Sequence, residues 1–194
     1  DNENKFFFSQ GFVAGEALKE AAANGKTVFI VEPTVKPDDE RMAGLIAQYR
    51  NGLGNASAEV SVVPLPVEMP VTEPGMEPPL FEVMKAKDFD TVFADNEDAK
   101  VVISLVGLPR DLQKMKYWTT APDKRPLLFL IGMSEARGLA AAIANNAVAG
   151  LITIGPGAKF NEDPAPNNPA EAFKVRYILI DKENVEANKA MLGE

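Results

Sequence analysis

Short apolar segments alternate with longer amphipathic segments along most of the chain. Six apolar runs are rich in branched residues, as buried strands are, and they cover residues 26–32, 58–65, 100–109, 125–133, 148–157 and 174–181. Between them, apolar side chains recur at helical spacing over residues 9–24, 36–54, 80–96, 110–124, 134–147 and 183–192. Only between the fifth and sixth strands is no helix expected, because residues 158–172 are polar and rich in proline.

This alternation is typical of an α/β protein with a mostly parallel sheet. Residues 101–106 and 127–131 are almost wholly apolar, as expected for strands that are covered on both faces. We therefore predict a three-layer αβα doubly wound fold with a mostly parallel sheet of about five to six strands in the order 2-1-3-4-5. The last strand is an extra edge strand, and its direction stays open.

A proline-rich segment, residues 64–79 (Pro64 to Pro79), follows the second strand. A domain boundary there would leave two strands and two helices before it, and a two-stranded parallel sheet cannot cover its own faces. We therefore predict one α/β domain over residues 1–194, with an N-terminal arm and helix in residues 1–25 and the proline-rich segment as a loop within the domain. Loops of this length are uncommon in compact domains and are often functional.

The net charge of −8 argues against nucleic acid or an anionic membrane as a partner, because both require a basic surface. Residues 68–98 hold nine acidic side chains against Lys85 and Lys87, so a charge of −7 lies in this segment. An ordinary solvated face explains such a cluster, and a site for a cation or a basic partner is the alternative.

The chain has neither cysteine nor histidine. Disulfides, thiolate chemistry, histidine-based triads and histidine metal sites are therefore excluded. No apolar run reaches the length of about 18 residues that a transmembrane helix needs. The chain begins at Asp1 rather than methionine, so we expect a mature or trimmed form, and an extracytoplasmic location after loss of a signal or anchor is slightly favoured over a cytoplasmic one.

In a doubly wound sheet, ligands bind beyond the carboxyl ends of the strands, near the point where the strand order reverses. Four residues of the loops expected there are candidate ligand-binding residues: Thr34, Gly107, Arg110 and Ser134. Gly107 lets the backbone approach a ligand, and the Arg110 guanidinium can bind a carboxylate or phosphate. The alternatives are that Gly107 serves a turn, that Arg110 pairs with an acid, and that the hydroxyls of Thr34 and Ser134 cap the backbone.

Other possible sites are weaker. The sequence GPGAKF at residues 155–160 lacks the spacing of a phosphate loop, and the segment after the first strand lacks the GxGxxG of a dinucleotide site. Asp38 and Asp39, with Glu32 nearby, could hold a magnesium ion, but two acids at a helix start are more often capping charges. We therefore assign no catalytic residue and no metal ligand, and the cofactor is unknown.

The strand–loop and strand–helix segments KVVISLVGLP, AGLITIG and YILIDKENVEANKAM resemble one lobe of periplasmic-binding-protein-like α/β proteins. The resemblance implies ligand binding without chemistry, usually outside the cytoplasm. Those proteins close two lobes over a ligand, whereas the pattern here accounts for one lobe, so a closed cleft would require a dimer.

Three functions are compatible with the sequence. The favoured one is a non-catalytic domain that binds a small molecule or a protein partner at the carboxyl-end rim of the sheet and is tethered outside the cytoplasm. The second is an enzyme with a carboxylate-held metal or a cofactor at the same rim. The third is a scaffolding domain that docks a protein partner through the loop of residues 64–79, and a homodimer is compatible with all three.

Overall fold

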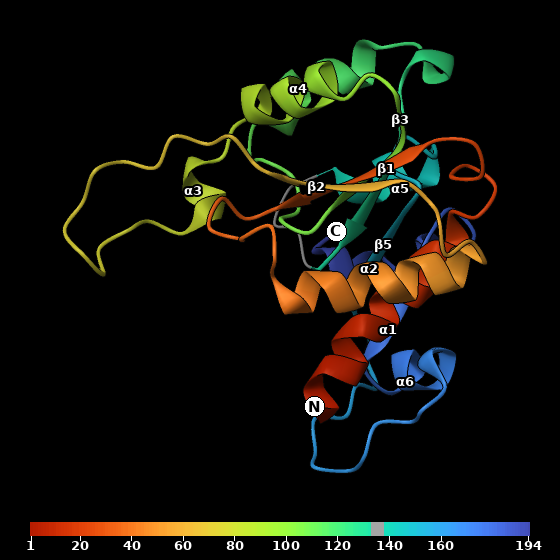
Figure 1. The fold of residues 1–194 in the computed structure, drawn as a ribbon. Helices are drawn as coiled ribbons and strands as arrows, with labels where there is room; N and C mark the ends of the chain where they lie inside the picture. Colours follow the sequence, from red (N-terminus) through yellow and green to blue (C-terminus); the bar gives the residue numbers. More distant parts are fainter. Residues whose placement is uncertain (133–137) are drawn as a thin grey trace.

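The computed structural model describes residues 1–132 and 138–194. These residues form a sheet between two layers of helices (Figure 1). The strands are β1 (Lys26–Val31), β2 (Val60–Pro64), β3 (Ala99–Ser104), β4 (Leu127–Ile131), β5 (Gly150–Ile154) and β6 (Tyr177–Ile180). The α-helices are α1 (Asn2–Ala17), α2 (Glu40–Leu53), α3 (Leu80–Val83), α4 (Ala86–Asp95), α5 (Leu139–Ala144) and α6 (Pro169–Arg176). The 3-10 helices are η1 (Leu112–Lys114), η2 (Lys116–Thr119), η3 (Pro122–Lys124) and η4 (Glu186–Leu192).

The strand order β2-β1-β3-β4-β5-β6 confirms the predicted topology. Neighbouring strands from β2 to β5 are parallel, and β6 pairs with β5 in the antiparallel direction. Ile154 at the end of β5 lies opposite Tyr177 at the start of β6. The chain therefore re-enters the sheet at the carboxyl end of β5, and this makes the edge strand antiparallel.

Alternate side chains of the central strands enter two separate cores, one on each face of the sheet. On one face, Val102 and Leu130 pack with α4 residues such as Phe89 and with α5. On the other face, Phe29 and Ile103 pack with residues of α1, α2 and α6. This burial of both faces explains why the strands are apolar at nearly every position.

One expectation about the end of the chain is wrong, because a helix does lie between the fifth and sixth strands. The Asn168 side chain caps α6 by accepting hydrogen bonds from the backbone N–H groups of Ala170 (2.8 Å) and Glu171 (3.3 Å). Pro169 occupies the first helical position, where proline needs no hydrogen-bond partner. An asparagine followed by proline is a common helix start, and this signal outweighs the polar composition of the segment.

The N-terminus is also different from the expectation, because it is helical from Asn2 rather than an arm that leads to a helix at residue 9. The Asp1 side chain accepts a hydrogen bond from the Glu3 backbone N–H at 2.9 Å and so caps α1. Phe6 is buried against Ala165 and Ala172. The aromatic residues near the start of the chain therefore belong to the packed face of a helix.

Three other segments expected to be α-helices form shorter helices or 3-10 helices. The crossover at residues 110–124 consists of three 3-10 helices, and the final segment is the 3-10 helix η4 rather than an α-helix. The helix expected over residues 80–96 is interrupted at Met84, and Asp88 then accepts a hydrogen bond from the Lys85 N–H at 2.8 Å. Asp88 thus stabilises the start of α4 from inside its first turn.

Two buried tyrosines make the stability of this fold sensitive to high pH. Burial raises the pKa of Tyr49 and of Tyr117 to about 12. The unfolded chain ionises tyrosine near pH 10, so the free energy of unfolding should fall between about pH 10 and pH 12, by about 1.4 kcal/mol per tyrosine and pH unit. Urea unfolding at a series of pH values measures this loss.

The matched control removes one tyrosine hydroxyl without leaving a buried polar atom unpaired. The hydroxyls of Tyr49 and Thr27 lie 2.7 Å apart and are both buried, so the suitable variant is Tyr49→Phe combined with Thr27→Val. Its alkaline loss of stability should be smaller than that of the wild type. An equal loss in both proteins would show that Tyr49 ionises normally in the fold.

Candidate functional site

A cavity of about 370 Å³ opens at the carboxyl ends of the central strands, on the face that α1 and α2 cover. It lies where the strand order reverses, since β1 has β2 on one side and β3 on the other. Its polar and aromatic lining comes from α1, from the segment after β1 and from the start of α2, and the ends of β3 and β4 supply its base. This is the place where doubly wound sheets usually bind ligands.

Local turn and cap interactions shape the mouth of this cavity. After β1, the Val35 N–H donates to the Glu32 carbonyl oxygen at 3.1 Å and turns the chain. Asp39 then caps α2 by accepting a hydrogen bond from the Met42 N–H at 2.9 Å. Because the cap fixes where the helix begins, Arg41 falls in its first turn and borders the cavity.

Arg41 and Phe7 form a stacked pair between α2 and α1. The Arg41 guanidinium carbon lies 3.9 Å from the centre of the Phe7 ring, within the range of a cation–π interaction. Among residues 1–132 and 138–194, Arg41 has no carboxylate within salt-bridge distance. Its exposed guanidinium therefore keeps N–H donors available at the cavity, across from the exposed carboxylate of Glu32.

Gln10 completes the polar side of the cavity from α1. This side chain is buried, and its Nε2 donates a hydrogen bond to the Phe7 carbonyl oxygen at 3.1 Å. The bond fixes the orientation of the amide on the face of α1 that borders the cavity. The site therefore combines an aromatic ring, a cation, an anion and an amide around one opening.

Three of the four residues proposed from the sequence, Thr34, Gly107 and Arg110, lie in loops after the strands but do not line this cavity. Thr34 is exposed in the loop after β1. Gly107 has a positive φ of 74°, and its carbonyl oxygen accepts a hydrogen bond from the buried Ser104 hydroxyl at 2.7 Å, so it serves a tight turn. Arg110 is exposed, and its guanidinium lies 4.0 Å from the centre of the Phe81 ring, toward the opposite face of the sheet. Ser134 lies outside the described residues.

One of the acidic residues after β1, Asp39, serves local structure. Asp39 is occupied as the cap of α2, in agreement with the capping interpretation. Across the described parts of the chain, no three acidic side chains come together in a group that could hold a metal ion.

The position of Arg41 in the sequence contains a signal that the pattern of apolar residues does not reveal. A cation in the first turn of a helix faces the positive end of the helix dipole and is unfavourable there. Such a placement indicates that the charge has another purpose, here the stack on Phe7. No comparable local signal identifies Phe7 and Gln10, because their place at the cavity depends on how α1 packs on α2.

Comparison with known proteins places the fold. No protein-family model matches the chain, and no curated protein is similar to it in sequence. Among solved structures, it is similar to AraP, an arabinose-binding protein from Geobacillus stearothermophilus, with a TM-score of 0.53 at 10% identity over 93% of this chain. GanP, a glucose–galactose binding protein from the same organism, gives a TM-score of 0.53 at 10% identity over 92%. A periplasmic ribose ABC transporter protein from Conexibacter woesei gives 0.52 at 12% identity over 95%.

These similarities confirm the expected resemblance to periplasmic-binding-protein-like α/β proteins at the level of the fold. The aligned part spans 62%, 61% and 60% of the three neighbours, respectively. No helix among the described residues is long and apolar enough to cross a membrane.

Proposed function

We propose that this chain is a non-catalytic domain that binds a small, hydroxyl-rich molecule in the cavity bordered by Phe7, Glu32 and Arg41. The observation that carries the proposal is the Arg41 guanidinium, stacked on Phe7 at the cavity with no carboxylate partner among the described residues. A planar guanidinium held in this way offers several N–H donors to ligand oxygens. Stacking reduces the conformational freedom that the side chain would lose on binding.

The chemistry of the lining favours a sugar-sized ligand. Hydroxyl groups can accept hydrogen bonds from Arg41 and donate them to the Glu32 carboxylate, and the apolar C–H face of a sugar ring can pack on Phe7. The cavity volume of about 370 Å³ lies in the range of about 300–1,000 Å³ that is usual for small-molecule sites. The arabinose and glucose–galactose specificities named for the structural neighbours support the same ligand class.

Thermal unfolding with a panel of pentoses and hexoses tests this proposal. A ligand of the native state at about 100 times its Kd stabilises the fold by about 2.7 kcal/mol. We expect at least one sugar to do so, and we expect Arg41→Ala to weaken its binding at least about tenfold, since hydrogen bonds to a charged group contribute about 1.5–3 kcal/mol. Calorimetric titration of both proteins gives the two Kd values.

Arg110→Ala is the matched control, because it removes an exposed, ring-stacked arginine at the same rim but outside the cavity. It should leave sugar binding unchanged. If Arg110→Ala rather than Arg41→Ala abolished binding, the ligand would sit on the other face of the sheet. Stabilisation by a divalent metal alone, lost in Glu32→Gln, would favour an enzyme instead of a binding domain.

We also propose that residues 1–194 form one domain with the proline-rich segment as an internal loop. The inclusion of β1 to β6 in one sheet supports this proposal. Cleavage of the exposed proline-rich segment by a protease should then leave the two fragments associated under native conditions. Separation of the fragments on gel filtration would argue for two domains.

A further inference from the structure

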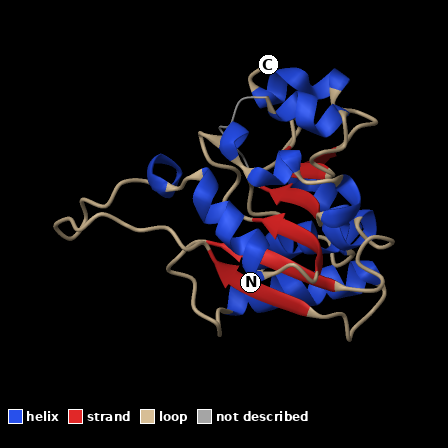
Figure 2. Cartoon of the chain, turned by 90° about the horizontal axis from the view of Figure 1, so that it is seen from above, coloured by secondary structure: helices blue, strands red, loops and turns tan. Residues whose placement is uncertain are grey.

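The proline-rich segment projects away from the body of the molecule, and residues 66–79 are here named the arm. Figures 1 and 2 show it (yellow in Figure 1) extending beyond the carboxyl ends of the strands. The Leu65 N–H donates to the Val31 carbonyl oxygen at 2.9 Å and so ends the pairing with the sheet. Farther along the arm, the hydrogen bonds are local, as between the Met76 N–H and the Glu73 carbonyl oxygen at 3.0 Å.

The arm exposes large apolar side chains. Val71 is fully exposed, and Met76 and Met69 are 70% and 39% exposed. These are three of the five large apolar residues that stand exposed in the described parts of the chain, and the other two are Ile154 and Phe160. A concentration of exposed apolar side chains on one projection indicates a binding surface.

Prolines hold the arm extended and acids give it one sign of charge. Proline recurs at every fourth position (Pro66, Pro70, Pro74 and Pro78), and each ring fixes its own φ. A preformed extended segment loses little conformational entropy on binding. Glu68, Glu73 and Glu77 are the charged residues of the arm, so it carries −3.

A groove with matching properties lies on the same molecule. It has a volume of about 490 Å³ between α4 and the 3-10 helices η2 and η3. Phe93 and Tyr117 line it with ring centres 5.1 Å apart, and Arg125 lies 4.6 Å from the centre of the Tyr117 ring. Aromatic grooves of this kind are the usual receptors for extended proline-rich segments.

The groove is locally positive although the whole chain is acidic. Lys116, Lys124 and Arg125 line it against Asp90 and Glu97, which gives a charge of +1 in a chain of −8. Within the described residues, neither lysine has a carboxylate in salt-bridge distance. Both lysine ammonium groups are therefore available to an acidic segment.

The arm and the groove lie at opposite ends of the sheet. The arm follows the carboxyl end of β2, whereas Glu97 and Pro126 of the groove directly precede β3 and β4 at their amino ends. Figure 1 shows the arm extending away from α4, which forms one wall of the groove. In this structure the arm therefore points away from the groove of its own molecule, and the groove that it can meet in this position is that of another molecule.

We propose that the arm of one copy docks in the groove of a second copy, so that molecules associate head to tail. Val71 and the methionines of the arm contact the half-buried ring of Phe93, which packs on the buried Tyr117, and the arm glutamates face the two lysines. Such a heterologous contact leaves one free arm and one free groove, so assemblies grow into a ring or an open chain. A single short segment in one groove buries less surface than a standard stable interface, so we expect the association to be weak and reversible.

Sedimentation equilibrium over a wide range of protein concentration tests this contact. The average mass of the wild type should rise with concentration, and less so at high salt, which screens the charges. Two charge-reversal variants should each remain monomeric: an arm variant with Glu68→Lys and Glu73→Lys, and a groove variant with Lys116→Glu and Lys124→Glu. A mixture of the two should associate again, because the unchanged arm of the groove variant meets the unchanged groove of the arm variant, and the lysine arm meets the glutamate groove.

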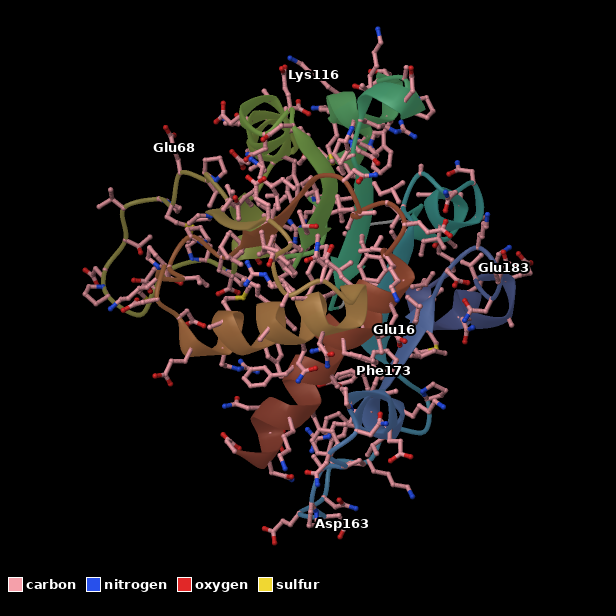
Figure 3. The ribbon with its side chains drawn as sticks, turned by 45° about the vertical axis from the view of Figure 1, so that its right-hand side comes forward. Glu16, Glu68, Lys116, Asp163, Phe173 and Glu183 are labelled. Atoms are coloured by element: carbon pink, nitrogen blue, oxygen red, sulfur yellow. The ribbon has the colours of Figure 1, made fainter. Side chains whose placement is uncertain are left out.

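Restored association in the mixture cannot result from misfolding of either variant. Glu16 and Glu183 are exposed and lie elsewhere on the surface (Figure 3), so Glu16→Lys combined with Glu183→Lys is the charge-matched control and should associate as the wild type does. A wild type that stays monomeric at every concentration would overturn the proposal. So would an arm variant that still associates, or a mixture that does not.

Discussion

Replacing Arg176 by alanine should destabilise the protein by about 3 kcal/mol, because the variant removes a large buried side chain that packs on aromatic rings. Arg176 is only 3% exposed. Its guanidinium donates to both carboxylate oxygens of Glu3, at 2.5 and 2.9 Å, and its Nε donates to the Lys159 carbonyl oxygen at 3.1 Å. It also lies over Phe6 and Phe160, with 3.8 and 4.7 Å to the ring centres.

The reason for this large effect is that Arg176 joins three segments that are distant in sequence. It connects the start of α1, the loop after β5 and the end of α6. Urea unfolding measures the loss of stability, and hydrogen exchange should show that the first turns of α1 lose protection first. Arg176→Lys keeps the charge but cannot make the forked contact, so it should recover only part of the stability.

Acid titration separates the ion pair from the packing. The hydrogen bonds from Arg176 lower the pKa of Glu3. A carboxylate with a lowered pKa stabilises the fold above its ordinary pKa, and this contribution is lost as the pH falls through the lowered value. Arg176→Ala should therefore be less sensitive to acid than the wild type. If both proteins lost stability in parallel below pH 4, Glu3 would not be coupled to folding.

Replacing Gly11 by alanine should destabilise the protein by about 2 kcal/mol and lower its Tm by about 4–8 °C. A Cβ at Gly11 would overlap the carbonyl oxygen of Leu45 in α2, and a Cβ at Gly15 would overlap that of Tyr49. Gly52 makes the corresponding contact from α2 to Phe12. The two helices thus touch backbone to backbone, and an added methyl group must push them apart.

The sign of this change is informative, because the intrinsic preference acts in the opposite direction. Alanine stabilises a helix by about 1 kcal/mol relative to glycine when nothing contacts the position. Glu16→Ala, at an exposed position of the same helix, should therefore be nearly neutral. A Gly11→Ala variant that is more stable than the wild type would show that α1 does not pack closely on α2. Thermal unfolding of the wild type, Gly11→Ala and Glu16→Ala measures the three Tm values that test this contact.

The close approach of α1 and α2 also positions the proposed ligand site. Phe7 is one helical turn before Gly11, and Arg41 is one turn before Leu45, so the pair stacks at the end of the same contact. We therefore expect Gly11→Ala to weaken ligand binding in addition to stability. The helix interface and the cavity are two consequences of one packing arrangement.

The sequence by itself determined the class of fold, the strand order and the place of the rim. Strand burial is encoded locally. Residues 127–131, for example, are apolar at every position, and this indicates burial on both faces without knowledge of the elements that cover them. The helix α6 shows that local signals can be overlooked, because Asn168 and Pro169 predict its start. Both kinds of inference use residues that are close together in the chain.

Only the tertiary structure decided which side chains meet. Phe7 and Arg41 come together because glycines allow α1 and α2 to touch, and Arg110 is directed to Phe81 instead of the cavity. The arm and the groove likewise acquire their opposite positions from the direction of the strands. Periodicity reports which face of an element is buried, whereas the convergence of distant side chains depends on the angle and separation at which the elements pack.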